Sequence, residues 1–264
     1  MSNLKACYQN RADSATLTAN PVAASSYPVT YLQNDERGYV FRSTSTAAQE
    51  VKGTWGGTAY TIGCAVLYRH NLVDGDTWRV QLYSGTAWTT SVYDSGTVSA
   101  FASGMFADWD WGFSVMYFTA VAGVKSFKIT VTSSSNPDGY VEAGRLLLGP
   151  VVDAPYNPKY GFQIGWADGS SKSRNPGGSV MVEAGGRYRQ ASFDMLLASE
   201  ADRAAWLEIG RACGASKTLW LSAAAGLTGA YERDLGMLGQ FDQSPAQRFS
   251  SYNIYDMSLQ FSEV

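Results

Sequence analysis

The sequence predicts a mainly β protein, with an N-terminal jelly-roll β-sandwich and a C-terminal β-sandwich flanked by one α-helix. Three observations lead to this fold class. Short stretches of alternating apolar and polar residues recur along the chain, and turn-forming residues separate them. Twenty-seven glycines and a charged fraction of 16% are typical of many short strands joined by tight turns. A single segment, residues 199–213, carries a strong helix pattern.

The first domain is expected over residues 1–150 and contains three clear strand patterns. Residues 65–68 form an apolar run that is typical of a buried strand. Residues 77–83 and 127–132 alternate, and each places three large apolar side chains on one face: Trp78, Val80 and Leu82 in the first, and Phe127, Ile129 and Val131 in the second. Turn signals lie at residues 74–76, 94–96 and 136–139. This spacing predicts a jelly roll or a sandwich.

A boundary is expected at residues 149–158, where Pro150, Pro155 and Pro158 interrupt any strand. The second domain then spans residues 151–264. Its strand patterns lie at residues 160–166, 187–195, 218–222 and 254–261, and a polar, glycine-rich loop is expected at residues 168–178.

The helix at residues 199–213 has signals at both ends. Ser199 can cap the first amide groups, and Asp202 completes a capping box three residues later. Gly214 supplies a left-handed exit. The expected apolar face consists of Ala201, Ala205, Trp206, Ile209 and Cys213. Because no second helix is expected, this face should lie across a sheet.

Composition excludes several classes of function. The net charge is −3 and no basic cluster is present, so nucleic-acid binding is not expected. No apolar run approaches the roughly 18 residues of a membrane span, and the N-terminus lacks the apolar core of a signal peptide. We therefore expect no membrane insertion, and assembly in the cytoplasm. The spacing of Cys7, Cys64 and Cys213 favours free thiols over disulfides or a cysteine zinc site.

Few residues carry recognisable chemistry. His70 is the sole histidine, and we interpret it as a strand-end residue bonded to backbone rather than a general base. No nucleophile elbow, phosphate loop or dinucleotide fingerprint is present. The acidic turns at residues 74–76 and 136–139 could form calcium loops, but turn chemistry explains them better. We predict no catalytic residue, no metal and no cofactor.

The most suggestive cluster is Asp108, Trp109, Asp110 and Trp111. In a strand, the two aspartates would share one face and the two tryptophans the other. The aromatic rings could stack on a pyranose while the carboxylates accept hydrogen bonds from its hydroxyl groups. The cluster could also contact a protein partner, or act as the paired carboxylates of a glycosidase. The remaining interpretation is structural, with tryptophans in the core and aspartates in water.

The first domain resembles a galactose-binding-like, discoidin-type jelly roll of the kind found in tailed-phage proteins. The resemblance covers roughly residues 15–150 and rests on the order of residues 32–43, 66–72, 77–83 and 140–146. It implies a sandwich that could bind sugar through its loops. It assigns no ligand residue, because those loops vary freely within the family.

The second domain is similar to minor and distal tail proteins of long-tailed phages. The pattern is a strand at residues 188–193, the capped helix, an aromatic strand within residues 214–220, and a closing strand within residues 255–264. In that family, the helix-flanked domain forms a ring around the tail channel. The domain order differs here, because the ring domain comes first in the commonest distal tail layout.

The leading hypothesis is therefore a structural, non-enzymatic protein of a phage tail tip or baseplate. It would form a six-fold or three-fold ring, bind other tail proteins, and reside in the virion after assembly in the host cytoplasm. The first alternative is a carbohydrate-binding module for host adhesion, with Asp108, Trp109, Asp110 and Trp111 in contact with a surface glycan. The second alternative is a polysaccharide-degrading enzyme.

Overall fold

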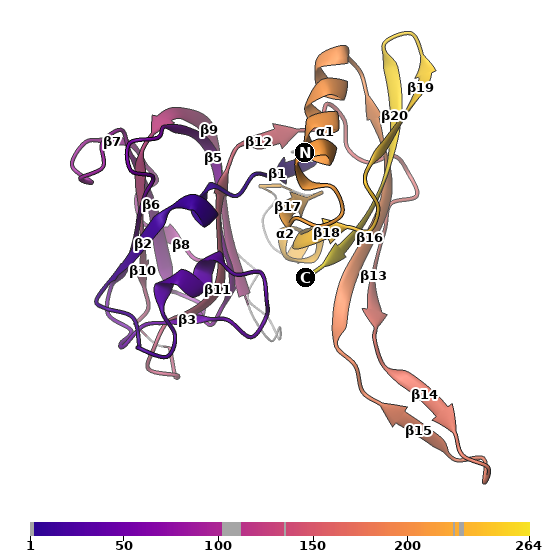
Figure 1. Ribbon diagram of the computed structural model, residues 1–264, viewed down its shortest axis with the longest axis horizontal. Coiled ribbons are helices and arrows are strands. Elements are labelled where there is room, and N and C mark those ends of the chain that lie inside the picture. The colour runs from indigo at the N-terminus through magenta and orange to yellow at the C-terminus, as the bar shows by residue number, and fades with distance from the viewer. Residues whose placement is uncertain (1–2, 102–111, 135, 224, 227–229) are drawn as a thin grey trace. The chain divides into compact units, whose positions relative to one another are not determined.

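The computed structural model describes residues 3–101, 112–134, 136–223, 225–226 and 230–264, and it is mainly β, as the sequence predicts (Figure 1). Contacts divide the chain into two compact units. Unit 1 comprises residues 1–153 and 219–236, and unit 2 comprises residues 154–218 and 237–264. This division differs from the sequence-based one at residue 150 in two respects. The first boundary lies after residue 153, and residues 219–236 make their contacts with unit 1.

Unit 1 contains a β-sandwich of two antiparallel sheets. The six-stranded sheet has the order β2-β4-β10-β6-β7, with β8 also paired to β6; the four-stranded sheet has the order β3-β11-β5-β9. The strands of the first sheet are β2 (Thr16–Asn20), β4 (Gln49–Thr54), β6 (Thr77–Tyr83), β7 (Ser91–Asp94), β8 (Val98–Ser99) and β10 (Ser126–Thr132). Those of the second are β3 (Phe41–Arg42), β5 (Tyr60–His70), β9 (Gly112–Val124) and β11 (Glu142–Gly149).

The core of the sandwich is made by the alternating residues that the sequence identified. Trp78, Val80 and Leu82 are buried, and so are Phe127, Ile129 and Val131 on the neighbouring strand β10. A gap of about 10 Å³ lies between the side chains of the two sheets. It has room for a single water molecule at most. This gap is therefore too small to hold a ligand.

Three short strands complete unit 1. β1 (Lys5–Cys7) lies between β12 (Val151–Asp153) and β17 (Leu219–Ser222) and pairs antiparallel with both. Gly149 precedes β12, and a Cβ at this position would lie 2.7 Å from the carbonyl oxygen of Tyr8. The sequence did not indicate the remaining helices, namely the 3₁₀ turns η1 (Arg11–Ser14) and η2 (Val29–Gln33) and the short helix α2 (Ala230–Leu235).

Unit 2 contains an antiparallel sheet covered on one face by a helix (Figure 1). β20 (Ile254–Glu263) lies at its centre and pairs with β16 (Arg187–Leu197), β18 (Gly236–Phe241) and β19 (Ala246–Ser251), and β13 (Gln163–Asp168) pairs with β16. Buried and more exposed residues alternate along β16 and β20. Tyr255, Met257, Leu259 and Phe261 are buried beside the helix, whereas Ser258 and Gln260 are exposed on the opposite face.

In helix α1 (Glu200–Cys213), the predicted N-cap at Ser199 and the predicted exit at Gly214 are confirmed, whereas Asp202 accepts from Ser199 Oγ rather than from its backbone N. Ser199 Oγ accepts a hydrogen bond from Asp202 N at 3.1 Å, and Gly214 leaves the helix with a φ of 53°. The predicted apolar face is wrong at Ala201, which is exposed. The buried stripe is instead Trp206, Ile209, Gly210 and Cys213, because these residues follow i, i+3, i+4 and i+7 spacing toward β16 and β19. All three cysteines of the chain are buried free thiols.

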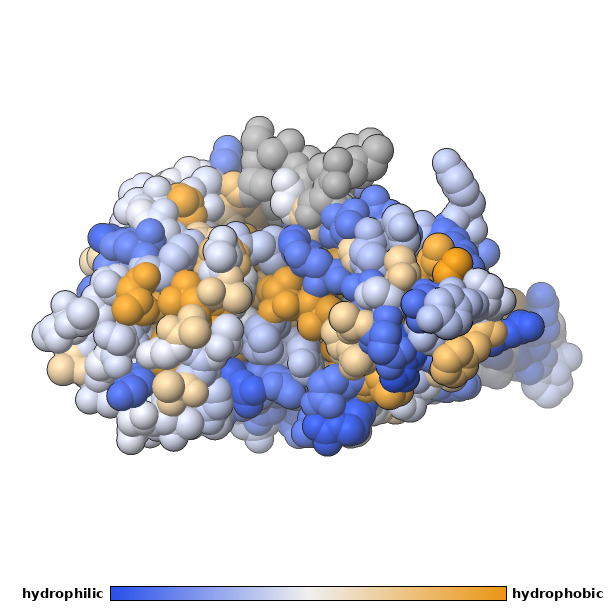
Figure 2. Space-filling view, turned by 90° about the horizontal axis from the view of Figure 1, so that it is seen from above, coloured by the Kyte–Doolittle hydropathy of each residue, from blue (hydrophilic) through white to orange (hydrophobic). Residues whose placement is uncertain are grey.

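A long two-stranded ribbon extends β13 and β16. The predicted loop at residues 168–178 is wrong, because it contains β14 (Ser171–Arg174), which pairs with β15 (Val180–Glu183). Five large apolar side chains of the ribbon are between 37% and 60% exposed: Ile164, Trp166, Val180, Met181 and Val182. An isolated hairpin is marginally stable in water. Elsewhere, on the face that Figure 2 shows, apolar residues form small patches among polar ones.

Candidate binding sites

The loops of unit 1 gather at one end of the sandwich, which we call the loop end. In the four-stranded sheet, β5 ends at His70 opposite Gly112, where β9 begins, and His70 also pairs with Ala143 near the start of β11. Residues 71–76 connect β5 directly to β6 of the other sheet. Both sheets therefore present these strand ends on the same side of the sandwich, and residues 136–141 lead into it as well.

The predicted contact residues Asp108, Trp109, Asp110 and Trp111 lie outside the described residues. Their described neighbours can be placed. Phe101 follows β8, whose Ser99 pairs with Thr77, and Gly112 begins β9 opposite His70. Phe101 and Gly112 therefore both lie near the loop end.

The loop end contains a cluster of two tyrosines and an ion pair, which we call the Arg42 cluster. Arg42 on β3 lies with its guanidinium carbon 4.3 Å from the ring centroid of Tyr27 and 4.7 Å from that of Tyr140. Its Nε donates a hydrogen bond to Glu142 Oε2 on β11, which raises the pKa of Arg42. All four residues are half-buried.

Hydrogen bonds fix the backbone around the Arg42 cluster. Asn71 Nδ2 donates to Asp138 Oδ2 at 2.8 Å, and Asn71 Oδ1 accepts from Glu142 N at 2.8 Å. Asn136 Nδ2 in turn donates to the carbonyl oxygen of Asn71 at 2.9 Å. These contacts tie residues 136–141 to the end of β5. The Arg42 cluster is therefore held in place before any ligand arrives.

His70 is a structural residue, as the sequence predicted. Leu72 N donates to His70 Nδ1 at 3.3 Å, so Nε2 carries the proton and donates to Ser114 Oγ at 2.8 Å. Ser114 Oγ donates to the carbonyl oxygen of Ala100 at 2.6 Å. Burial lowers the pKa of His70 from 6.5 to about 3, because the charged imidazolium would lose its water.

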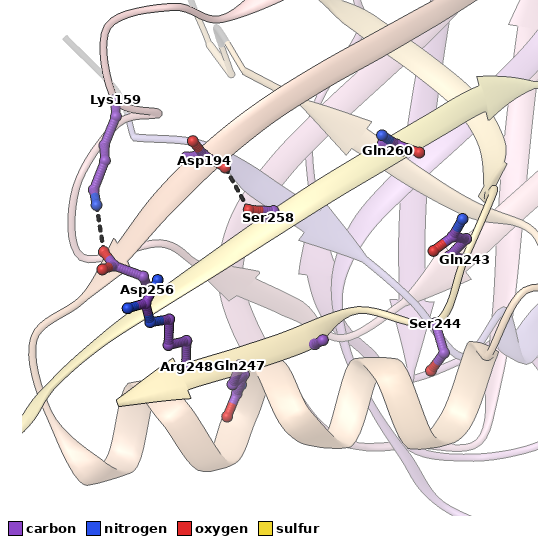
Figure 3. A pocket seen from close by; sticks show the side chains of 10 residues that line it. Lys159, Asp194, Gln243, Ser244, Gln247, Arg248, Asp256, Ser258 and Gln260 are labelled. Carbon is purple, nitrogen blue, oxygen red and sulfur yellow. Dashed lines mark hydrogen bonds and ion pairs between the residues drawn. The ribbon is translucent and has the colours of Figure 1, made fainter. Parts of the chain in front are cut away.

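Unit 2 carries a polar groove on the exposed face of its sheet, which we call the β20 groove (Figure 3). Its floor consists of Asp256, Ser258 and Gln260, which alternate along β20. Asp194 and Lys159 lie on one side, and β19 with the turn before it lies on the other. The cavity measures about 490 Å³, which is within the usual range for small-molecule sites.

Some groups of the β20 groove are paired and others are not. Lys159 Nζ contacts Asp256 and lowers its pKa, and Ser258 Oγ donates to Asp194 Oδ1 at 2.5 Å. Gln247 points from β19 toward α1, where its Nε2 donates to Arg203 O at 3.0 Å. Among the described residues, four lining side chains have no hydrogen-bond partner: Gln243, Ser244, Arg248 and Gln260.

Unit 1 contains a buried carboxylate whose oxygens accept hydrogen bonds from neighbouring protein groups. Glu232 on α2 accepts hydrogen bonds from Tyr117 Oη at 3.1 Å, Ser222 Oγ at 2.9 Å and Gly226 N at 2.5 Å. Burial raises the pKa of Tyr117 well above 10. These contacts indicate a structural role.

Within the described ranges, we find no group of three or more acidic, histidine or cysteine residues that could hold a metal ion. The same ranges contain no helix long and apolar enough to cross a membrane.

The sequence analysis did not identify the Arg42 cluster or the β20 groove as sites. Arg42, Tyr140 and Glu142 occur there only within residues 32–43 and 140–146, on which the jelly-roll resemblance rests. The only local signal is Tyr140 two residues before Glu142, which places both on one face of a strand. Pairing between strands far apart in sequence decides which of these residues meet.

Comparisons with known proteins give similar structures but no family. No family model matches the chain, and no curated protein matches its sequence. A chitosan-binding module of a Paenibacillus chitosanase/glucanase has a TM-score of 0.41 at 13% identity, covering 54% of this chain and all of that one. A Clostridium perfringens carbohydrate-binding module, solved with GalNAc-β-1,3-galactose, has a TM-score of 0.41 at 8% identity, with the same two coverages.

A fucose-binding module of Streptococcus pneumoniae has a TM-score of 0.40 at 11% identity, covering 53% of this chain and 94% of that one. The similar structures named here are thus carbohydrate-binding modules. All of these scores are low, so the similarity carries no argument about function. The resemblance to tail proteins stays a prediction.

Proposed function

We propose that the protein binds carbohydrate at the loop end of unit 1. The supporting observation is the Arg42 cluster, in which an ion pair lies between two half-buried tyrosine rings. Apart from Nε, the guanidinium nitrogens of Arg42 have no hydrogen-bond partner among the described residues, and neither does Glu142 Oε1. These atoms offer donors and an acceptor side by side.

This combination suits a sugar. A sugar hydroxyl both donates and accepts hydrogen bonds. It can therefore accept a hydrogen bond from the guanidinium of Arg42 and donate one to the neighbouring carboxylate oxygen of Glu142. The tyrosine rings add apolar area that can cover the C–H face of a pyranose, while their hydroxyl groups stay solvated. Trp109 and Trp111, which the sequence pattern predicts as sugar contacts, would add further aromatic area. The proposed role is binding rather than catalysis.

A glycan array tests this proposal. We expect the full chain to bind capsule or lipopolysaccharide fragments of bacterial surfaces. Arg42→Gln should weaken binding by tenfold or more, since a hydrogen bond to a charged group contributes about 1.5–3 kcal/mol. Trp109→Ala should also weaken binding, because it removes an aromatic ring that stacks on the sugar. Release of reducing ends during the same incubation would show catalysis instead.

The matched control is Arg79→Gln. Arg79 forms a comparably exposed ion pair with Asp94 on the six-stranded sheet, with side chains 40% and 33% exposed. This variant should bind as well as the unaltered protein. Equal losses in Arg42→Gln and Arg79→Gln would contradict a site at the Arg42 cluster, and an array without signal would contradict carbohydrate binding.

The second candidate function is the structural one, as a ring-forming subunit of a phage tail tip that binds other tail proteins. The observation that favours it is the ribbon of unit 2. Its exposed apolar side chains, Val180, Met181 and Val182 among them, would be covered in an assembly. Strand edges of this kind also pair readily with other chains.

Light scattering of the purified protein tests the assembly. We expect a closed oligomer, six-fold or three-fold, that Met181→Lys dissociates by placing a charge in the apolar patch. Thr18→Lys is the matched control, because Thr18 is an exposed strand residue of β2 in unit 1 and lies outside the ribbon. A monomer at every concentration, absent from purified virions, would contradict this second function.

A further inference from the structure

The β20 groove belongs to unit 2 and shares no residue with the loop end of unit 1, and its residues serve neither function proposed above. We infer that this groove binds a short, uncharged oligosaccharide. The inference rests on three features of the groove: its charge balance, its unpaired hydrogen-bonding groups, and the strands that form its floor.

The charges of the groove cancel. Lys159 and Arg248 are balanced by Asp194 and Asp256, and Lys159 is already paired with Asp256. Arg248 pairs across the ladder with Asp256, so it faces the same carboxylate from the other side. A ligand with a strong net charge would meet one attractive group and one repulsive group. An uncharged ligand meets no such conflict.

The unpaired groups match a ligand rich in hydroxyl groups. The amides of Gln243 and Gln260 each offer two donors and one acceptor, and Ser244 offers one donor and an acceptor. Arg248 adds donors at the other end of the groove, as Figure 3 shows. These groups lie along a floor of about 13 Å, from Asp256 to Gln260. Neighbouring sugar hydroxyl groups can therefore bond to several of them at once.

An extended peptide fits less well. Peptides that bind to sheets add a strand to an open edge and place side chains in apolar pockets. The floor strand β20 has no open edge here, because β16 and β19 pair with it on both sides. Ala246 is the one apolar residue in the lining of the groove. The groove thus offers a peptide neither backbone partners nor a pocket.

The test uses the full chain with Arg42→Gln as background, so that binding at the loop end does not contribute. Maltotriose, cellotriose and triacetylchitotriose are titrated by saturation-transfer NMR and calorimetry. We expect at least one of them to bind. Replacing both amides, in Gln243→Ala/Gln260→Ala, should weaken its binding about tenfold or more, since each lost hydrogen bond contributes about 0.5–1.5 kcal/mol.

Gln190→Ala is the matched control. Gln190 is an exposed glutamine on the same face of β16, where it donates to Ser262 Oγ at 3.2 Å, but it does not line the groove. The three glutamines are on the surface, so both variants should keep the thermal stability of the unaltered chain. The inference is overturned if the double variant binds like Gln190→Ala, if none of the three sugars binds, or if neutral peptides compete better than sugars. Each of these results leaves the array result for Arg42→Gln unaffected.

Discussion

Replacing Glu263 with glutamine is expected to lower the free energy of unfolding of unit 2 by about 3–5 kcal/mol. Glu263 on β20 and Arg189 on β16 form an ion pair whose side chains are 1% and 3% exposed. Arg189 donates to both carboxylate oxygens, from Nε at 3.1 Å and from Nη2 at 2.5 Å, and its backbone N donates as well, at 3.1 Å. The substitution leaves a buried guanidinium without its counter-charge.

Urea unfolding followed by hydrogen exchange of β16 and β20 measures this loss within unit 2. The control is Glu208→Gln, which breaks the exposed pair between Glu208 and Arg211 on α1. Solvent screens such a pair, so this variant should unfold like the unaltered protein. If Glu263→Gln behaves in the same way, the buried pair does not hold the sheet together. Replacing both partners with methionine should recover much of the loss, because it removes both buried charges.

Acidification is expected to destabilise unit 1 through His70. The pKa of His70 is about 3 in the folded chain and 6.5 in the unfolded chain. Between these values the unfolded chain binds a proton that the folded chain does not, so stability falls as the pH drops from about 6.5 toward about 3. Each pH unit within this window removes about 1.4 kcal/mol, so the loss at pH 4.5 is about 2–3 kcal/mol.

Two measurements check the role of His70. Because the chain has one histidine, its ring protons give a single NMR titration, and we expect no imidazolium in the folded protein at pH 5. In parallel, urea unfolding of His70→Gln at pH 7 and pH 4.5 should show a smaller loss on acidification than the unaltered chain shows. A titration midpoint near 6.5 in the folded protein, or an equal acid sensitivity of both chains, would contradict this account.

Local sequence patterns predicted much of the fold, because caps and strand alternation depend on residues that are close together in the sequence. Ser199, Asp202 and Gly214 define the ends of α1 through contacts within a few residues. Alternation located β6, β10, β16 and β20, because side chains of a strand point to opposite faces regardless of the strand's partner. The ribbon at β14 and β15 was missed, because a polar, glycine-rich stretch reads as a loop when its partner strand is unknown.

The candidate sites were harder to predict, because distant pairing creates them. Asp108, Trp109, Asp110 and Trp111 were selected by composition alone and remain a prediction. Tyr27, Arg42 and Tyr140 meet only because β3 pairs with β11 at the loop end. Asp194 and Arg248 border one groove only because β16 and β19 both pair with β20.

The sequence by itself determined that the chain is mainly β, and it located the principal strands and the one long helix. It also indicated that His70 has a structural role. The tertiary structure alone decided that residues 219–236 belong to unit 1, and which polar side chains are left without partners at a surface. The physical reason is the range of the interactions. Caps, turns and alternation act within a few residues, whereas strand pairing and burial depend on chain segments that fold together from far apart.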